Sequence, residues 1–234
     1  MSRKLSFGVD EFYHLYNRGG DKRQIFNDHS DYDRFLRLLY LCNDTKPVEL
    51  RRSWQDRGGE ASADQERELM VDIGTYCLMP NHFHLLVKER VEGGISIFMH
   101  KLSTGYSMYF NLKHERTGSL FEGAFKAKHI DGDEYLKYSF AYIHLNPVKL
   151  IKPNWREQGI GDTKQVHRYL ESYPYSSYNH YVTNNKSSDP IINQVAFPDY
   201  FNQKGDFINY LNEWLKYNED EPAAEAKPPR ALLF

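Results

Sequence analysis

The chain has 234 residues, 40% hydrophobic and 26% charged, a composition typical of a water-soluble protein with one sizeable domain and an appended segment. The net charge is −2, and residues 1–218 alone are neutral, so phosphate binding needs a local basic surface. Two cysteines exclude a disulfide framework. The sequence shows neither a membrane-length apolar run nor a signal peptide, which makes a cytoplasmic location the expectation.

The N-terminal part of the chain predicts a strand and a helix. Residues 11–20, EFYHLYNRGG, alternate along the segment and end in a glycine pair, as expected of a strand followed by a turn. Residues 28–43 open with the candidate caps Asp28, Ser30 and Asp31 and continue with apolar residues at helical spacing, which predicts an amphipathic helix. The polar stretch 45–68 is expected to be a mobile insertion.

The middle of the chain predicts a hairpin, two helices and a further strand. Pro80 and Asn81 separate two strand-like runs, 69–79 and 82–89, and mark a hairpin turn. A helix is expected over 94–114, a strand over 120–130, and another helix after residue 131 that Pro147 stops. The order β-α-β-β-α-β, followed by a helix, indicates an α+β fold with a ferredoxin-like antiparallel sheet and helices on one face.

The C-terminal part is mixed. Residues 173–181 are aromatic and rich in turn formers, and 205–218 predict a short amphipathic helix. We therefore expect a main domain over residues 1–150, an extension over 151–218 that packs on it, and a disordered acidic tail over 219–234.

Two histidines one residue apart form the first candidate site. On a strand, alternation places His82 and His84 on one face, while Phe83, Leu85 and Val87 point into the core on the other. Both imidazoles could then bind one metal ion, which needs a third ligand from elsewhere. By itself, such a pair is more often structural or at the surface, because ten histidines in 234 residues make the spacing alone weak evidence.

The helix before Pro147 offers further polar groups. Tyr138, Tyr142 and Asn146 are spaced four apart and should share a face distinct from the apolar stripe. A tyrosine hydroxyl can attack a phosphodiester when a metal polarises the phosphoryl oxygens, and an amide oxygen one turn later could bind that metal. Each feature also has an ordinary explanation, because tyrosines are abundant and an asparagine before proline often ends a helix.

Four segments in succession resemble the single-tyrosine HUH transposases, most closely the REP-associated tyrosine transposases. They are YHLYNRGGDKRQIF (13–26), YCLMPNHFHLLV (76–87), TGSLFEGAFKAKHI (117–130) and YIHLNPVK (142–149). The resemblance implies a catalytic domain over residues 1–150. The resemblance to this family is expected to continue in the segment near residues 173–181. Four ordered segments are far more specific than any one motif.

The resemblance implies a site and a reaction. His82 and His84 would be catalytic and would bind Mg²⁺ or Mn²⁺ together with Asn146, and Tyr142 would be the nucleophile. Such enzymes cut and rejoin single-stranded DNA at hairpin-bearing ends through a 5′-phosphotyrosine. Asn17 and Arg18 lie in a matching segment and could contact DNA. Whether the chain is a monomer or a homodimer, and whether Tyr142 serves its own site or a partner's, stays open.

One position departs from the pattern. Relatives commonly have arginine after the glycine of the LFEG segment, where this chain has Ala124. Lys126 and Lys128 could replace that charge, because residues two apart on a strand share a face. Lys149 is a further candidate phosphate contact, as are Lys101, Lys113, Arg116 and Lys152, and Tyr106 and Tyr109 are candidates for stacking on bases.

Other functions remain open on the sequence alone. A metal-dependent phosphoesterase could use His82, His84 and Asn146 with an activated water instead of a tyrosine. Tyr138 could replace Tyr142 as the nucleophile. A DNA-binding protein without catalysis could recognise hairpins with the same surface. Formation of a covalent adduct that depends on Tyr142 distinguishes the first function from these alternatives.

Overall fold

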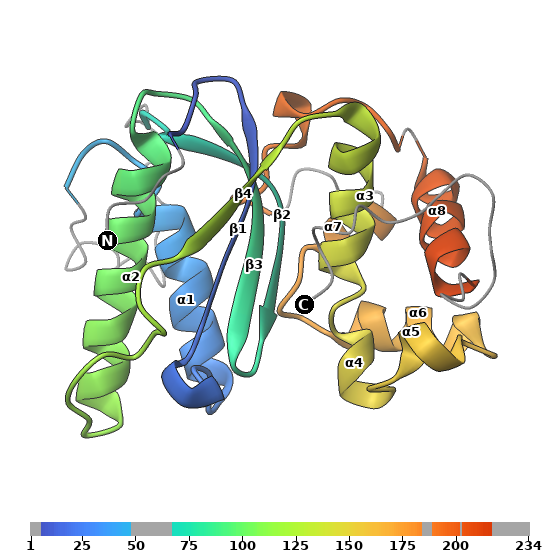
Figure 1. Cartoon of the computed structure of the whole chain (residues 1–234), viewed down its shortest axis with the longest axis horizontal. Helices are drawn as coiled ribbons and strands as arrows, with labels where there is room; N and C mark the ends of the chain where they lie inside the picture. Colours follow the sequence, from blue (N-terminus) through green and yellow to red (C-terminus); the bar gives the residue numbers. More distant parts are fainter. Residues whose placement is uncertain (1–5, 48–66, 184–188, 202, 217–234) are drawn as a thin grey trace, which may run out of the picture.

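Figure 1 shows the computed structural model of the chain, which describes residues 6–47, 67–183, 189–201 and 203–216. The strands β1 (Phe12–Arg18), β2 (Val71–Met79), β3 (His82–Glu89) and β4 (Lys126–Ile130) form one antiparallel sheet. Their order in the sheet is β2-β3-β1-β4, which with two intervening helices is ferredoxin-like and confirms the predicted α+β class. Most of the predicted insertion at 45–68 and the whole predicted tail at 219–234 lie outside the described residues.

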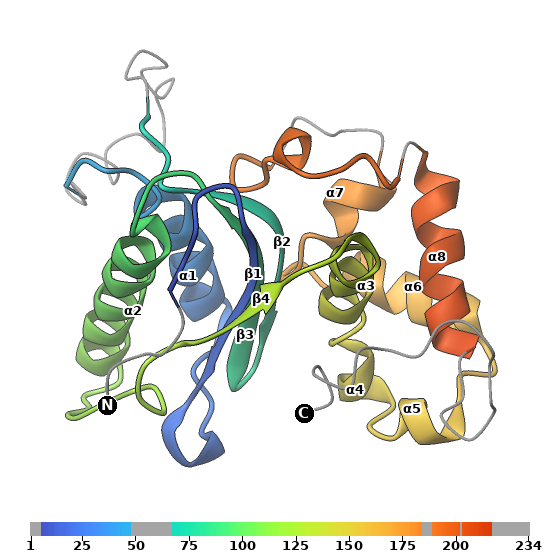
Figure 2. The same cartoon turned by 45° about the horizontal axis from the view of Figure 1, so that its top comes forward.

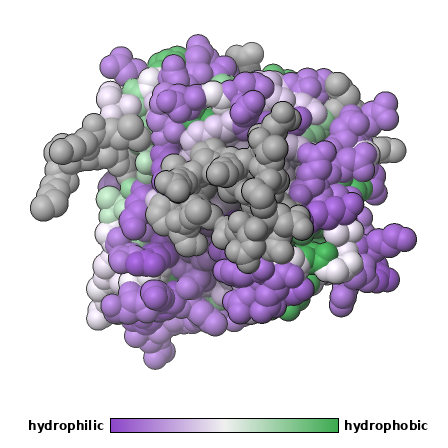
Figure 3. Space-filling model, turned by 45° about the vertical axis from the view of Figure 1, so that its right-hand side comes forward, coloured by the Kyte–Doolittle hydropathy of each residue, from purple (hydrophilic) through white to green (hydrophobic). Residues whose placement is uncertain are grey.

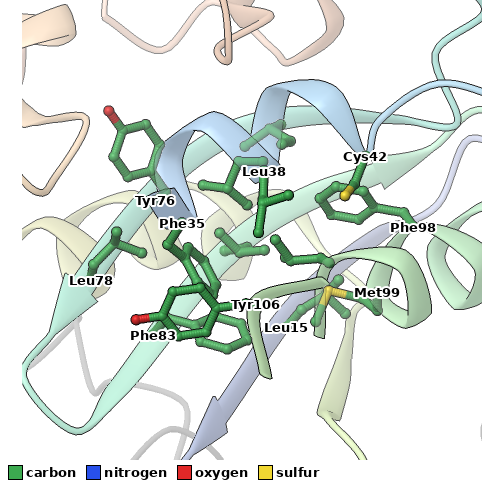
Figure 4. Close-up of a cluster of buried hydrophobic side chains, with 14 of the residues drawn as sticks. Leu15, Phe35, Leu38, Cys42, Tyr76, Leu78, Phe83, Phe98, Met99 and Tyr106 are labelled. Atoms are coloured by element: carbon green, nitrogen blue, oxygen red, sulfur yellow. The ribbon is translucent and has the colours of Figure 1, made fainter. Parts of the chain in front are cut away.

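The two helices expected from the sequence share one face of the sheet. Helix α1 (His29–Leu41) begins after Asp28, whose side chain accepts from the Asp31 N–H, and α2 (Gly94–Lys113) follows β3. Apolar side chains fill the space between these helices and the sheet (Figure 4). Phe35 of α1, Tyr106 of α2 and Phe83 of β3 are fully buried there. Tyr106 is therefore a core residue and not a base-stacking platform.

The opposite face of the sheet is also covered. Helix α3 (Asp133–His144) packs on it, and α6 (Thr163–Ser172), α7 (Tyr178–Val182) and α8 (Lys204–Lys216) add further apolar surface. Two short helices, α4 (Val148–Ile151) and α5 (Trp155–Gln158), follow α3. Figures 1 and 2 show the sheet lying between α1 and α2 on one side and α3 with the C-terminal helices on the other. The chain thus buries both faces of its sheet.

Two connections decide where the functional residues lie. The hairpin turn at Pro80 and Asn81 joins β2 to β3, as predicted. The strand expected over 120–130 was predicted too long, because β4 begins only at Lys126. Gly123 has a positive φ of 77°, and the residues before it form only an isolated bridge, from Phe121 to Gly19 just after β1, beside a bond from the Glu122 N–H to the Arg18 carbonyl. The segment therefore bends around the end of β1 before it joins the sheet.

The aromatic segment near residue 175 fastens the C-terminal region to the edge strand β2. The Leu78 N–H donates to the Tyr175 carbonyl over 2.9 Å, and the Ser177 N–H donates to the Tyr76 carbonyl over 3.0 Å. The Ser177 hydroxyl accepts from the Tyr76 N–H over 3.0 Å and lies 2.8 Å from His144 Nε2. Because His144 Nδ1 donates to the Phe140 carbonyl, its Nε2 can only accept, and the hydroxyls of Ser177 and Thr75 both lie within hydrogen-bonding distance of it.

The visible surface beside the C-terminal helices is mostly hydrophilic over the described residues (Figure 3). Within the described part of the chain, none of the helices combines the length and apolar character that crossing a membrane requires.

We expect Ser177→Ala to lower the free energy of unfolding by about 1–3 kcal/mol, because it leaves the buried Tyr76 N–H without its partner. Urea unfolding followed by circular dichroism measures this loss. Ser172→Ala is the matched control, because that hydroxyl is exposed and donates only to the Tyr169 carbonyl of its own helix. Equal stability of the two variants would contradict the role given to Ser177.

Candidate active site

A pocket of about 250 Å³ lies between the sheet and the end of α3. In Figure 1 the β2–β3 turn and the C-terminal end of α3 lie at the same end of the molecule. The pocket is lined by Tyr16, Asn17, Arg18, Lys22, Asn81, His82, His84, Lys126, Tyr142, Asn146 and Lys149. It therefore brings together side chains from three strands, two turns and the α3–α4 region, separated by more than 100 residues in sequence.

Strand register places the two histidines. In the antiparallel ladder, Tyr16 of β1 stands opposite His84 of β3, and Arg18 stands opposite His82. Residues directly opposite in such a ladder share a face of the sheet. Both imidazoles consequently lie on one face of the sheet, as predicted, which is the face that α3 covers, and their ring centroids are 5.0 Å apart. Phe83 between them is buried in the core on the α1 and α2 face.

The end of α3 supplies Tyr142 and Asn146. The Tyr142 ring centroid lies 5.6 Å from that of His84 in the same chain. Helix α3 ends at His144, so Asn146 lies just beyond it, but its Nδ2 still donates to the Tyr142 carbonyl over 2.8 Å. This bond leaves Asn146 Oδ1 for the pocket.

Tyr138 does not join this group. Its ring packs against Trp214 of α8, with centroids 4.4 Å apart, and it is absent from the lining of the pocket. The prediction of one shared polar face was therefore wrong for Tyr138. The helix turns about 100° per residue, so a spacing of four drifts around the axis, and α8 covers the residue one turn earlier.

Each histidine of the pair is held through its Nδ1 atom. His82 Nδ1 lies 2.6 Å from Asn81 Oδ1, and His84 Nδ1 lies 2.9 Å from Nε2 of the buried His14. Because Asn81 Oδ1 can only accept, His82 carries its proton on Nδ1 and keeps a lone pair on Nε2. The His14–His84 bond allows either nitrogen to donate. His84 has a free Nε2 lone pair when it is the donor.

Burial keeps these imidazoles neutral. It lowers the pKa of His82 to about 4, with help from the positive charges of Lys149 and Arg18. The pKa of His84 is lowered well below its usual value, again mainly by burial and then by the neighbouring histidines. A neutral imidazole is the form that binds a metal ion. The pair is thus in its ligand form at neutral pH.

The pKa of the Tyr142 phenol shifts in the opposite direction, and the phenol is neutral as well. Burial raises its pKa, and the positive charge of Arg156 lowers it by a smaller amount. The Arg156 guanidinium carbon lies 5.2 Å from the centre of the Tyr142 ring, which is a cation–π distance. Tyr142 is therefore a protonated phenol at neutral pH with a cation beside its ring.

The donor set fits a divalent metal. Two Nε2 atoms and the Asn146 Oδ1 belong to side chains of one pocket, and the other polar atoms of those side chains are already hydrogen-bonded. In the described residues no group of three or more His, Cys, Asp or Glu side chains could hold a metal. The Asn146 amide oxygen could therefore serve as a third ligand beside the two imidazoles.

Cations surround this neutral centre. Arg18, Lys22, Lys126 and Lys149 all line the pocket, and no carboxylate does so among the described residues. The Arg18 guanidinium is bound by the Glu122 carboxylate, in part through a bond of 2.9 Å from Nη2. Such a lining favours an anionic ligand.

Two other predicted DNA contacts have different positions. Asn17 lines the pocket but is 4% exposed, and its side chain accepts from the Arg18 N–H and donates to the Gly123 carbonyl. Lys128 stands opposite His14 and so shares the face of Lys126, but it lies outside the pocket lining. Burial lowers its pKa. Asn17 thus shapes the turn, and Lys128 lies one step further along the sheet.

The remaining candidate phosphate contacts do not line the pocket. Lys101 and Lys152 donate to backbone carbonyls, Lys113 is bound by Asp28 and Asp31, and Arg116 reaches Asn111. They serve local structure in this chain.

Several residues in and around the pocket were not found from the sequence. Tyr16, Lys22 and Asn81 line the pocket, whereas His14 and Arg156 lie behind it, in contact with His84 and Tyr142. The alternation of β1 could have indicated His14 and Tyr16, because both fall on the polar face of a predicted strand. No sequence pattern places Lys22 or Arg156 beside the histidines, because their positions depend on contacts between distant segments.

Comparison with known proteins points to one family. A family model for IS200-like transposases matches residues 12–146. A search of curated proteins finds no match. Two similar solved structures are a REP-associated tyrosine transposase bound to a REP hairpin and a putative transposase from Deinococcus radiodurans R1. The first has 13% identity and a TM-score of 0.48, covering 87% of this chain and 98% of its own. The second has 13% identity and a TM-score of 0.34, covering 61% and 94%.

The matched segment begins at β1 and ends at Asn146, so it contains both histidines of the pair and Tyr142. Because that match spans more than half of the chain, the protein belongs to the IS200-like transposase family and is an enzyme that acts on DNA.

Proposed function

We propose that this transposase cuts and rejoins single-stranded DNA with Tyr142 as the nucleophile and a divalent metal bound by His82, His84 and Asn146. The observation that carries this proposal is the single pocket in which these four side chains meet, lined by cations. Hairpin-bearing single strands are the substrate class that the resemblance to REP-associated tyrosine transposases implies.

The chemistry balances within this pocket. The Tyr142 oxygen attacks a phosphorus atom of the strand, and the bond from that phosphorus to the 3′-oxygen breaks. The phenol loses its proton as the leaving 3′-oxygen gains one, so the products are a 5′-phosphotyrosine and a free 3′-hydroxyl. Attack of a 3′-hydroxyl on the phosphotyrosine reverses the step and rejoins DNA without another energy source.

The chain's own groups bind and orient the strand. A bound Mg²⁺ or Mn²⁺ would polarise the phosphoryl oxygens and so lower the barrier to attack. Arg18, Lys22, Lys126 and Lys149 would hold the phosphates on either side of the reacting one. The packing of α3 holds the Tyr142 ring beside His84, so the nucleophile needs little reorganisation.

We expect an SDS-resistant protein–DNA adduct when the protein meets a pool of labelled single-stranded hairpins with Mn²⁺. Tyr142→Phe should abolish it, because the ring remains but the attacking oxygen is lost. Tyr138→Phe is the matched control, since its hydroxyl lies outside the pocket, and it should retain the adduct. Cleavage that persists without adduct in Tyr142→Phe would favour the phosphoesterase. Loss in Tyr138→Phe alone would make that residue the nucleophile.

Metal removal gives an independent prediction. Treatment with EDTA should abolish adduct formation, and Mn²⁺ should restore it at a lower concentration than Mg²⁺, because imidazole ligands suit Mn²⁺ better. His82→Ala should lose the adduct, whereas His129→Ala should keep it, since His129 pairs with Glu11 at the surface of β4. Full adduct formation by the metal-free protein would refute the metal site.

The Arg18–Glu122 pair predicts that DNA affinity is restrained in the wild-type protein. Glu122→Gln should release the guanidinium and tighten binding to a single-stranded oligonucleotide about two- to fivefold at low salt. The gain should shrink as salt rises, since exposed charges are screened. Glu92→Gln, an equal charge change beyond the opposite end of β3, is the control in a fluorescence anisotropy titration. Equal gains in both variants would show an effect of net charge only.

A further inference from the structure

Backbone hydrogen bonds connect the turn after β1 to the β2–β3 hairpin. The Gly19 N–H donates to the Asn81 carbonyl over 2.9 Å, and the Ile25 N–H donates to the Pro80 carbonyl over the same distance. The side chain of Asn81 completes the contact, because its Nδ2 donates to the Lys22 carbonyl over 3.2 Å. With the bond of 3.2 Å from the Phe26 N–H to the Pro80 carbonyl, four hydrogen bonds tie residues 19–26 to the two residues before His82.

The turn adopts a costly backbone conformation to make these bonds. Asp21 and Lys22 both have positive φ, 55° and 58°, which residues with a side chain rarely adopt. A Cβ atom at Gly19 would lie 2.3 Å from the Arg23 carbonyl oxygen, so only glycine fits there. This conformation directs the Lys22 carbonyl at Asn81 and the Lys22 side chain into the pocket.

The Lys22 carbonyl decides which way the Asn81 amide points. A carbonyl can only accept, so the NH₂ end of the amide must face it. The oxygen end then faces His82 Nδ1 at 2.6 Å. Because this oxygen can only accept, the imidazole must carry its proton on Nδ1, and its Nε2 keeps the lone pair.

We infer that Asn81 is a positioning residue that relays the orientation of the Lys22 carbonyl to His82 and holds that imidazole in the tautomer that binds metal through Nε2. The inference rests on the proposed function for the metal itself. The tautomer of His82 does not, since it exists in the metal-free protein. In water, an imidazole prefers its proton on Nε2, so the relay holds His82 in its less common form.

The Nδ1 partner of His84 does not fix the tautomer of that imidazole in the same way. That partner is another imidazole, His14, and either ring can donate in that bond. The partner of His82 has no such freedom, because a backbone carbonyl fixes it. One member of the pair is therefore set for metal before any metal arrives.

The test measures the His82 tautomer and the affinity for Mn²⁺ in three variants. Long-range ¹H–¹⁵N NMR of the metal-free protein, with His82→Ala to assign the signal, reports which ring nitrogen carries the proton. Electron paramagnetic resonance of free Mn²⁺ gives the dissociation constant. Asn81→Ala removes the acceptor, and Asn81→Asp keeps an acceptor oxygen but cannot donate to Lys22. Asn111→Ala is the matched control, since it removes an asparagine–carbonyl bond of 2.9 Å from α2 to Gly118, away from the pocket.

We expect wild type and Asn111→Ala to hold the proton on Nδ1. Asn81→Ala should shift it toward Nε2 and weaken Mn²⁺ binding about 10- to 100-fold. Asn81→Asp should keep the Nδ1 proton and bind Mn²⁺ more tightly than Asn81→Ala. An unchanged tautomer in Asn81→Ala, or equal loss of affinity in both Asn81 variants, would overturn the inference. Failure of wild type to bind Mn²⁺ would instead overturn the proposed metal site, while the NMR result would still decide the role of Asn81.

Discussion

The two-residue period of β1 and β3 is the constraint on which the site depends. Leu15, Phe83 and Leu85 are completely buried against α1 and α2, so the alternate residues of both strands must face the other way. A shift of one residue in either strand would exchange the two sets and expose the core. The apolar core on one face thus fixes the imidazoles of His82 and His84 on the other.

The cover on the second face then sets the chemical state of those groups. Helix α3 and the C-terminal helices bury His84 and Tyr142 to 5% and 3% exposure, which disfavours the charged form of each. The centre of the pocket consists of neutral donors, and its charges come from lysine and arginine side chains around it. A small basic lining of this kind can attract phosphates although the whole chain has a net charge of −2.

Local patterns predicted much of this arrangement. The alternation of residues predicted that the two histidines share a face, and Pro80 and Asn81 predicted the hairpin. Pro147 predicted where α3 ends. Each of these features depends on residues that are neighbours in sequence. The expected strand over 120–130 was too long, since the bend at Gly123 follows from contacts with the end of β1.

Features that depend on distant segments could not be predicted in this way. Tyr138 and Tyr142 look equivalent in sequence, but Tyr138 packs against Trp214 of α8, whereas Tyr142 lines the pocket. The contact between His14 and His84 exists only through the register of β1 against β3. Sequence spacing carries no information on either partner. The DNA contacts expected of Asn17 and Lys128, and the metal ligands, stay predictions.

The end of the family match is not the end of the site. The matched segment stops at Asn146, yet Lys149 lines the pocket and Arg156 places its guanidinium over the Tyr142 ring. Ser177 hydrogen-bonds the edge strand β2 and His144 at the end of α3, so the region after residue 146 also holds that helix on the sheet. Because the position of α3 determines where the Tyr142 oxygen lies, residues outside the matched segment help to define the surroundings of the proposed nucleophile. The expected boundary at residue 150 thus falls between Lys149, which lines the pocket, and Arg156, which contacts Tyr142.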